Sequence, residues 1–157
     1  MNRNLPAFLL LMFLFFSCHQ GGQYHRSLRI PSSGWEINNK FHFEDSISDD
    51  MPEVLKLELN LRHNPHYTYS NIWLYIRIST SDSLTRMDTV NWALANPSGH
   101  WIGKGWGSLY SLNYQLPDLI IKNTGSTRWF KIDIQHGLRD NALKGLEDIG
   151  IRVYSEK

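Results

Sequence analysis

The clearest pattern along the chain is the alternation of apolar and polar residues in residues 54–62. Every second position there is a leucine: Leu55, Leu57, Leu59 and Leu61. Successive side chains of a β-strand point to opposite faces, so this spacing predicts a half-buried strand. Residues 72–79 repeat the pattern with isoleucine and leucine. The loop between the two segments predicts two antiparallel neighbours that contribute to one core.

Other segments show the same period of two, and they are residues 35–43, 85–94, 109–116, 129–136 and 149–153. A turn is predicted at residues 96–99, because Pro97 presets φ and Gly99 supplies a positive φ. Residues 139–148 have helical spacing instead. The whole pattern predicts an all-β chain: an antiparallel, jelly-roll-like β-sandwich of about 7–8 strands with one short helical turn near the C-terminus.

The first 17 residues have a different character. Arg3 precedes an apolar run, residues 5–16, which is interrupted by Pro6 alone. A bilayer-spanning helix needs roughly 20 apolar residues, so this run is too short to cross a membrane. Its length matches the apolar region of a secretory signal peptide, and the small residue Ser17 stands just before the expected cleavage point. We therefore predict a signal peptide over residues 1–17.

Cys18 follows directly and is the single cysteine of the chain. A disulfide within one molecule is therefore excluded. A lone cysteine after such an apolar region resembles the lipobox of bacterial lipoproteins, where the thiol takes a diacylglycerol and the new amino group is acylated. An ordinary signal peptide with an incidental cysteine is the alternative. Several acyl chains hold a protein on a membrane far more firmly than one chain does.

The mature chain divides into a lipidated tether, residues 18–33, and a β-sandwich domain, residues 34–157. Glycines and polar residues without a clear period mark the tether. An Asp after the lipidated cysteine can retain a lipoprotein in the inner membrane, but His19 stands there. Residues 19–24 also lack the acidic cluster that often accompanies surface export. We expect the cell outer membrane, on its periplasmic face.

Composition narrows the function classes. The formal net charge is +1 and no polybasic run is present, so nucleic-acid binding has no electrostatic support. Hydrophobic residues make up 41% of the chain, enough for a proper core, and the aromatic share of 13% favours β structure. Nothing in the sequence indicates a cofactor.

Residues that might carry chemistry form weak patterns. His63 and His66 form an HxxH pair that could hold zinc, but Pro65 places the pair in a loop and no third ligand is near in sequence. We interpret both as solvated loop histidines. Residues 103–107 are rich in glycine yet lack the Lys-Ser/Thr of a phosphate loop. No serine has a nucleophile-elbow context, so we predict no metal site and no catalytic residue.

Aromatic residues are the best candidates for a binding role. Trp101, Lys104 and Trp106 stand on a glycine-rich loop, and Trp73 and Tyr75 have the outward parity of their strand. Tryptophan and tyrosine are enriched at binding hot spots, so we predict that these five residues contact a partner. The competing interpretation is structural: the rings fold back to cap the core, and the loop glycines merely permit the path of the chain.

Several segments resemble the gliding motility lipoprotein family GldH of Bacteroidetes. Besides Cys18 and the strand that follows Trp35, they are residues 62–76, 88–110 and 130–153. The most specific pattern comprises Leu94, Ala95, Gly99, Trp101, Gly103 and Gly105. The pair His136-Gly137 departs from the family, which would have an acidic and an apolar residue there.

This resemblance implies a non-enzymatic, membrane-anchored component of the gliding apparatus or a related envelope assembly, bound to other envelope proteins. A carbohydrate-binding sandwich that captures glycans is the alternative, since such modules also use aromatic platforms.

Overall fold

The computed structural model describes residues 24–83 and 85–155, with the backbone but not the side chain of Trp106. Every secondary-structure element in this part is a β-strand. The strands are β1 Tyr24–Arg29, β2 Trp35–Glu36, β3 Phe41–Ser46, β4 Val54–His63, β5 Asn71–Thr80, β6 Thr85–Ala93, β7 Lys104–Trp106, β8 Leu109–Lys122, β9 Trp129–His136, β10 Ala142–Leu143 and β11 Leu146–Tyr154. The described residues include no helix that could span a membrane. The predicted signal peptide and Cys18 lie outside them.

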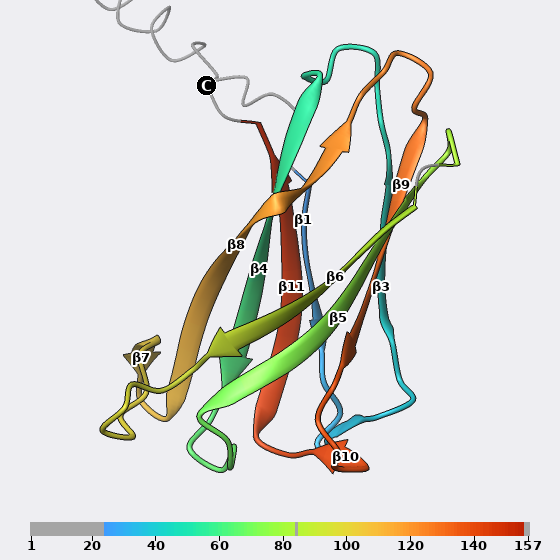
Figure 1. Cartoon of the computed structure of the whole chain (residues 1–157). Helices are drawn as coiled ribbons and strands as arrows, with labels where there is room; N and C mark the ends of the chain where they lie inside the picture. Colours follow the sequence, from blue (N-terminus) through green and yellow to red (C-terminus); the bar gives the residue numbers. More distant parts are fainter. Residues whose placement is uncertain (1–23, 84, 156–157) are drawn as a thin grey trace, which may run out of the picture.

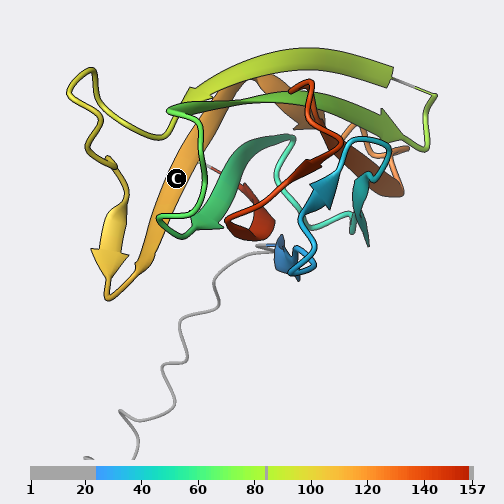
Figure 2. The ribbon, with the colours of Figure 1, turned by 90° about the horizontal axis from the view of Figure 1, so that it is seen from below.

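The strands form two antiparallel layers (Figures 1 and 2). One sheet has the order β1-β11-β4-β8-β7 and the other β3-β9-β5-β6, while β2 and β10 form a separate short pair. Apolar side chains from both inner faces meet in a single buried cluster. This arrangement confirms the predicted all-β, sandwich-like fold.

The alternating segments pack as their pattern predicts, but not in the predicted partnership. Leu59 of β4 and Ile72 of β5 are both fully buried in the shared core, as expected. The expectation that β4 and β5 are paired neighbours is wrong: β4 pairs with β11 and β8, and β5 pairs with β9 and β6. Residues 64–70 carry the chain from one layer to the other, so the two segments face each other across the core.

The segment with helical spacing holds a short strand and a tight turn, not a helical turn. Residues 142–143 form β10, and β11 begins at Leu146 after a turn in which Gly145 has a φ of 83°. Leu143 and Leu146 are both buried because they stand on opposite sides of this turn, each directed into the core. Their spacing of three positions therefore imitates a helical face.

More strands are present than the 7–8 expected, because β2, β7 and β10 are two or three residues long and β1 falls in the segment assigned to the tether. β1 pairs with β11 from Tyr24↔Val153 to Arg29↔Asp148. Four of its six residues are exposed, which leaves little alternation to detect. The sandwich thus includes residues earlier than the predicted start at residue 34.

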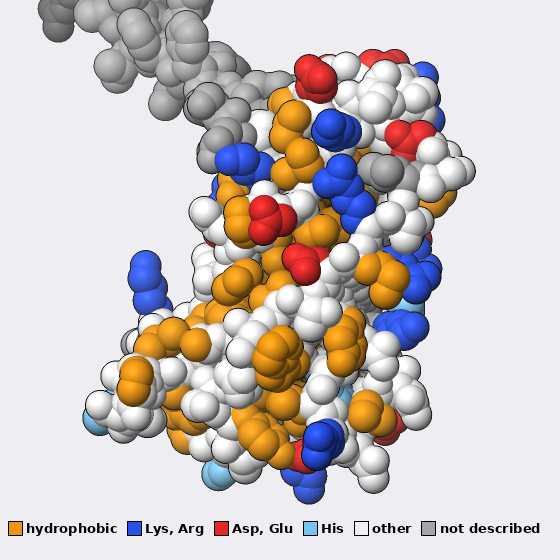
Figure 3. Space-filling model, viewed as in Figure 1, with side chains coloured by type: hydrophobic (Ala, Val, Ile, Leu, Met, Phe, Trp, Pro, Cys, Tyr) orange, Lys and Arg blue, Asp and Glu red, His pale blue; other side chains and the backbone are white. Residues whose placement is uncertain are grey.

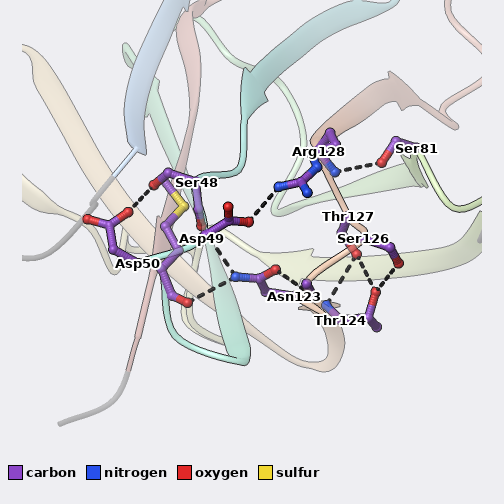
Figure 4. A network of polar contacts seen from close by, with 11 residues as sticks. Ser48, Asp49, Asp50, Ser81, Asn123, Thr124, Ser126, Thr127 and Arg128 are labelled. Carbon is purple, nitrogen blue, oxygen red and sulfur yellow. Dashed lines mark hydrogen bonds and ion pairs between the residues drawn. The ribbon is translucent and has the colours of Figure 1, made fainter.

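The two ends of the sandwich differ in what they carry. We call the end where β1 begins the proximal end; it also holds the β3–β4, β5–β6 and β8–β9 connections. Polar contacts cross-link these turns, for example between Arg128 and Asp49 and from Asn123 Nδ2 to the Met51 carbonyl at 2.9 Å (Figure 4). The opposite, distal end holds residues 64–70, 94–103 and 137–145.

Candidate functional site

An exposed aromatic surface lies on the outer face of the four-stranded sheet. The alternation of β5 buries Ile72, Leu74 and Ile76 and sends Trp73 and Tyr75 outward, where they are 40% and 49% exposed. Met87 of the neighbouring strand β6 is 67% exposed on the same face. In the view of Figure 3, hydrophobic side chains gather over the part of the molecule where β5 and β6 run.

The residues around Trp73 and Tyr75 hold them in a defined arrangement. The N–H of Gly137 donates to the Trp73 carbonyl at 2.8 Å, which continues the β5–β9 ladder. A side chain on Gly137 would meet the Tyr75 ring, since its Cβ would lie 2.9 Å from Tyr75 Cε2. Beside them Arg77 contacts the Met87 sulfur at 3.6 Å. We name these five residues the outer aromatic face.

Trp101 lies elsewhere, in an aromatic cluster at the distal end. Its ring centroid is 4.5 Å from that of His63, and the rings of Tyr67 and Tyr110 complete the cluster. Trp101 is partly buried and packs against the core. Its backbone forms an isolated antiparallel β-bridge with Ala95 on the other side of the loop. This placement fits the structural interpretation of Trp101, in which the ring caps the core.

The other predicted contact residues of the glycine-rich loop, Lys104 and Trp106, are placed differently from Trp101. Lys104 is exposed at the start of β7, and the side chain of Trp106 lies outside the described part of the structure. Gly99 and Gly107 have φ values of 80° and 64°, as tight turns require. A Cβ on Gly103 would come within 2.8 Å of Leu112, so this glycine permits close packing on β8. The structure therefore does not bring the five predicted contact residues onto one surface.

His63 is not the solvated loop residue that its sequence context predicted. It ends β4 with the inward parity of the leucines before it, and it is fully buried, whereas His66 is exposed. Extending the alternation by one more step would have found this. Burial lowers the pKa of His63, and its Nδ1 lies 3.2 Å from the Asn64 carbonyl. Among the described residues no group of three or more potential ligands could hold a metal.

His136 is a second buried histidine, which the sequence analysis noted only as part of a departure from the family pattern and not as a candidate for chemistry. It ends β9 with inward parity, and its ring lies edge-on to Trp35 at 5.5 Å. Burial lowers its pKa, and backbone groups of Trp35 and Glu36 oppose that effect in part. Both histidines thus stand in aromatic surroundings that favour the neutral imidazole.

These features define a class: an antiparallel β-sandwich domain whose exposed aromatic residues lie on the outside of one sheet. Comparison with known proteins specifies it further. Residues 22–153 match the GldH lipoprotein family, and the chain belongs to that family. It is thereby a membrane-anchored lipoprotein of the Bacteroidetes type, as its resemblance predicted.

Two relatives show how far the similarity extends. The chain is 27% identical to the "Gliding motility lipoprotein GldH" of Flavobacterium johnsoniae over 96% of both chains. It is 28% identical to the "Gliding motility lipoprotein GldH homolog" of Christiangramia forsetii over 93% of this chain and 91% of the relative. Among solved structures, the infectious bursal disease virus VP2 subviral particle is similar at 13% identity over 86% of this chain and 33% of that one. The TM-score of this match is 0.33.

Proposed function

We propose that this lipoprotein is a non-catalytic component of an envelope assembly that serves gliding motility or a related task, and that it binds another envelope protein through the outer aromatic face. The observation that carries the proposal is the exposure of Trp73, Tyr75 and Met87 on a sheet whose inner face is already fully packed. Their exposure is not required by the core. Tryptophan, tyrosine and arginine are the residue types that dominate binding hot spots, and Arg77 completes that set.

The anchoring part of the proposal rests on residues before the described domain. Cys18 follows the apolar run directly, so cleavage there and acylation with palmitate or a similar chain would tether the sandwich to a membrane. His19 in place of Asp favours the outer membrane, and the absence of an acidic cluster in residues 19–24 favours its periplasmic face.

A crosslinking pull-down from cells that make the full-length lipoprotein tests the binding proposal. Trp73→Ala with Tyr75→Ala should lose envelope proteins that the wild type captures after chemical crosslinking. The matched control is Glu58→Ala with Gln115→Ala, a register pair on the outside of the other sheet, which should capture them as wild type does. Equal capture by both double variants would refute a role for the outer aromatic face.

The same protein on a glycan array tests the alternative. Robust glycan binding that disappears with Trp101→Ala would replace the proposed function by glycan capture. The partly buried position of Trp101 against His63 leads us to expect no such binding.

A further inference from the structure

β6 is one of the two edge strands of the four-stranded sheet. In an antiparallel ladder the backbone groups of alternate residues point to opposite sides. The Leu94 N–H donates to the Ser70 carbonyl at 2.8 Å, so even-numbered residues of β6 bond to β5. The N–H and C=O groups of the odd-numbered residues, among them Thr89, Asn91 and Ala93, therefore point away from the sheet.

This sheet also has one strand fewer than the five-stranded sheet on which it packs. β8 lies across the sandwich from β6. The ring centroids of Tyr114 on β8 and Trp92 on β6 are 5.4 Å apart. β7 continues the other sheet beyond β8, and Figure 2 shows no strand of the described chain opposite it. A groove of about 560 Å³ lies between these strands. Its lining is Trp92, Ile102, Gly103, Lys104, Ser111, Leu112 and Asn113.

The two halves of the β6 edge differ in how they resist pairing. Asp88 stands at a position of β6 with the same inward parity as Val90 and Trp92. Its Oδ1 accepts a hydrogen bond of 2.7 Å from the N–H of Thr89, which points away from the sheet. Inward charges are a means by which edge strands avoid association. The half that follows, residues 90–93, carries Val90 and Trp92 at the inward positions and borders the groove. Pairing is thus disfavoured at one half and open at the other.

We propose that the edge of β6 at residues 90–93 binds an extended segment of a partner protein, which adds as a fifth strand opposite β7. Backbone pairing supplies affinity in such strand addition, and alternate side chains supply specificity. Apolar side chains at every second position of the segment would enter the groove against Trp92, Ile102 and Leu112. Lys104 is the single charge among the described residues that line the groove, so an acidic side chain of the segment faces it. This edge shares no residue with the outer aromatic face, although Asn91 is the register partner of Trp73, and the inference does not depend on the function proposed there.

The test uses the full-length lipoprotein in detergent micelles and labelled nine-residue peptides, with fluorescence anisotropy as the readout. The peptides alternate Val, Ile or Phe with Thr and end in Asp or Lys, and each has a copy with N-methylated alternate amides. We expect the Asp peptides to bind and the N-methylated copies to bind at least tenfold more weakly. Lys104→Glu should reverse the preference toward the Lys peptides.

Protein variants then separate backbone pairing from loss of fold. Asn91→Pro removes one outward N–H and should lower affinity tenfold or more, whereas Asn91→Ala keeps that N–H and should bind as wild type. Trp73→Ala should also bind as wild type, which distinguishes this site from the outer aromatic face. The proposal is wrong if no peptide prefers wild type to Asn91→Pro, or if N-methylation has no effect. A concentration-dependent dimer that Asn91→Pro abolishes would instead assign the edge to a second copy of this chain.

Discussion

The ring of Tyr75 lies directly over the backbone of Gly137 on the outside of the four-stranded sheet. A Cβ at position 137 would come within 2.9 Å of Tyr75 Cε2 and 3.0 Å of Cζ. The absence of a side chain at this position therefore sets the orientation in which Tyr75 is presented.

Gly137→Ala should change the outer aromatic face without unfolding the domain. The new methyl group must displace the Tyr75 ring, which is free to move because it is half exposed. We expect a loss of unfolding free energy of about 1 kcal/mol or less, with weaker capture of the crosslinked partner. Ser79→Ala, an outward position further along β5, is the control and should change neither quantity. Unchanged capture by Gly137→Ala would show that the ring orientation is irrelevant.

Trp101→Ala should lower the free energy of unfolding much more than Trp73→Ala does. Trp101 packs on His63 in the distal cluster, so its removal should cost about 2–4 kcal/mol of unfolding free energy. Trp73 is 40% exposed, and its removal should cost about 0.5–1 kcal/mol. Urea denaturation of the two variants measures both. A small loss for Trp101→Ala would reopen its assignment as a contact residue.

Gly145 and Gly99 form a matched pair for backbone strain and packing. Both have φ values near 80°, so either substitution by alanine should cost about 1–2 kcal/mol in backbone strain. A Cβ on Gly145 would also lie 2.2 Å from the backbone nitrogen of Tyr67, whereas Gly99 has open space. Gly145→Ala should therefore lower the melting temperature clearly further than Gly99→Ala does. Similar melting temperatures would mean that the 64–70 loop yields easily.

The two buried histidines predict a loss of stability in acid. Burial lowers the pKa of His63 and His136 in the folded state, so the unfolded chain binds protons first as pH falls. The stability is fully present above the unfolded pKa of about 6.5 and is lost as the pH falls through the lower folded pKa values. We expect a smaller free energy of unfolding at pH 5 than at pH 7.5, measured by urea titration.

Variants assign that pH dependence to particular rings. His63→Phe should reduce the difference between pH 7.5 and pH 5, because an uncharged ring replaces the imidazole in the same aromatic cluster. His66→Gln, at an exposed position, should leave the difference as it is in the wild type. Carboxylates paired in the folded state also titrate in acid, so a difference that persists unchanged in the double variant His63→Phe with His136→Phe would assign it to them instead.

Cys18→Ala should abolish lipidation. Metabolic labelling with a palmitate analogue should mark the wild-type chain and leave the variant unlabelled, and the variant should remain uncut or be released from membranes. Ser17→Ala keeps a small residue before the cysteine and should be labelled like the wild type. Equal labelling of Cys18→Ala would contradict the lipobox interpretation.

Local pattern predicts much of this fold, but not how its strands are partnered. The alternation in residues 54–62, 72–79 and 129–136 identifies strands and their buried faces, because the period of two is a property of the backbone itself. Whether β4 pairs with β5 or faces it across the core depends on contacts with β8, β9 and β11, and no local pattern contains that information.

The errors in element assignment have local causes. β1 escapes detection since an exposed edge strand does not need alternation, and Leu143 and Leu146 imitate a helix across a turn. At the candidate site, the parity of Trp73 and Tyr75 was readable from the sequence. The burial of Trp101 was not, because it depends on how the 94–103 loop folds back onto His63.

The pairing of β1 with β11 has a mechanical consequence for a tethered protein. With the proposed anchor at Cys18 and a partner on the outer aromatic face, the membrane would pull on the start of β1 at the first pair, Tyr24↔Val153, and the partner would pull toward the distal end. The load then runs parallel to β1, so all six register pairs down to Arg29↔Asp148 resist sliding together instead of opening one after another. The first strand of the domain is thus placed to bear traction in shear, the geometry in which an antiparallel ladder yields last.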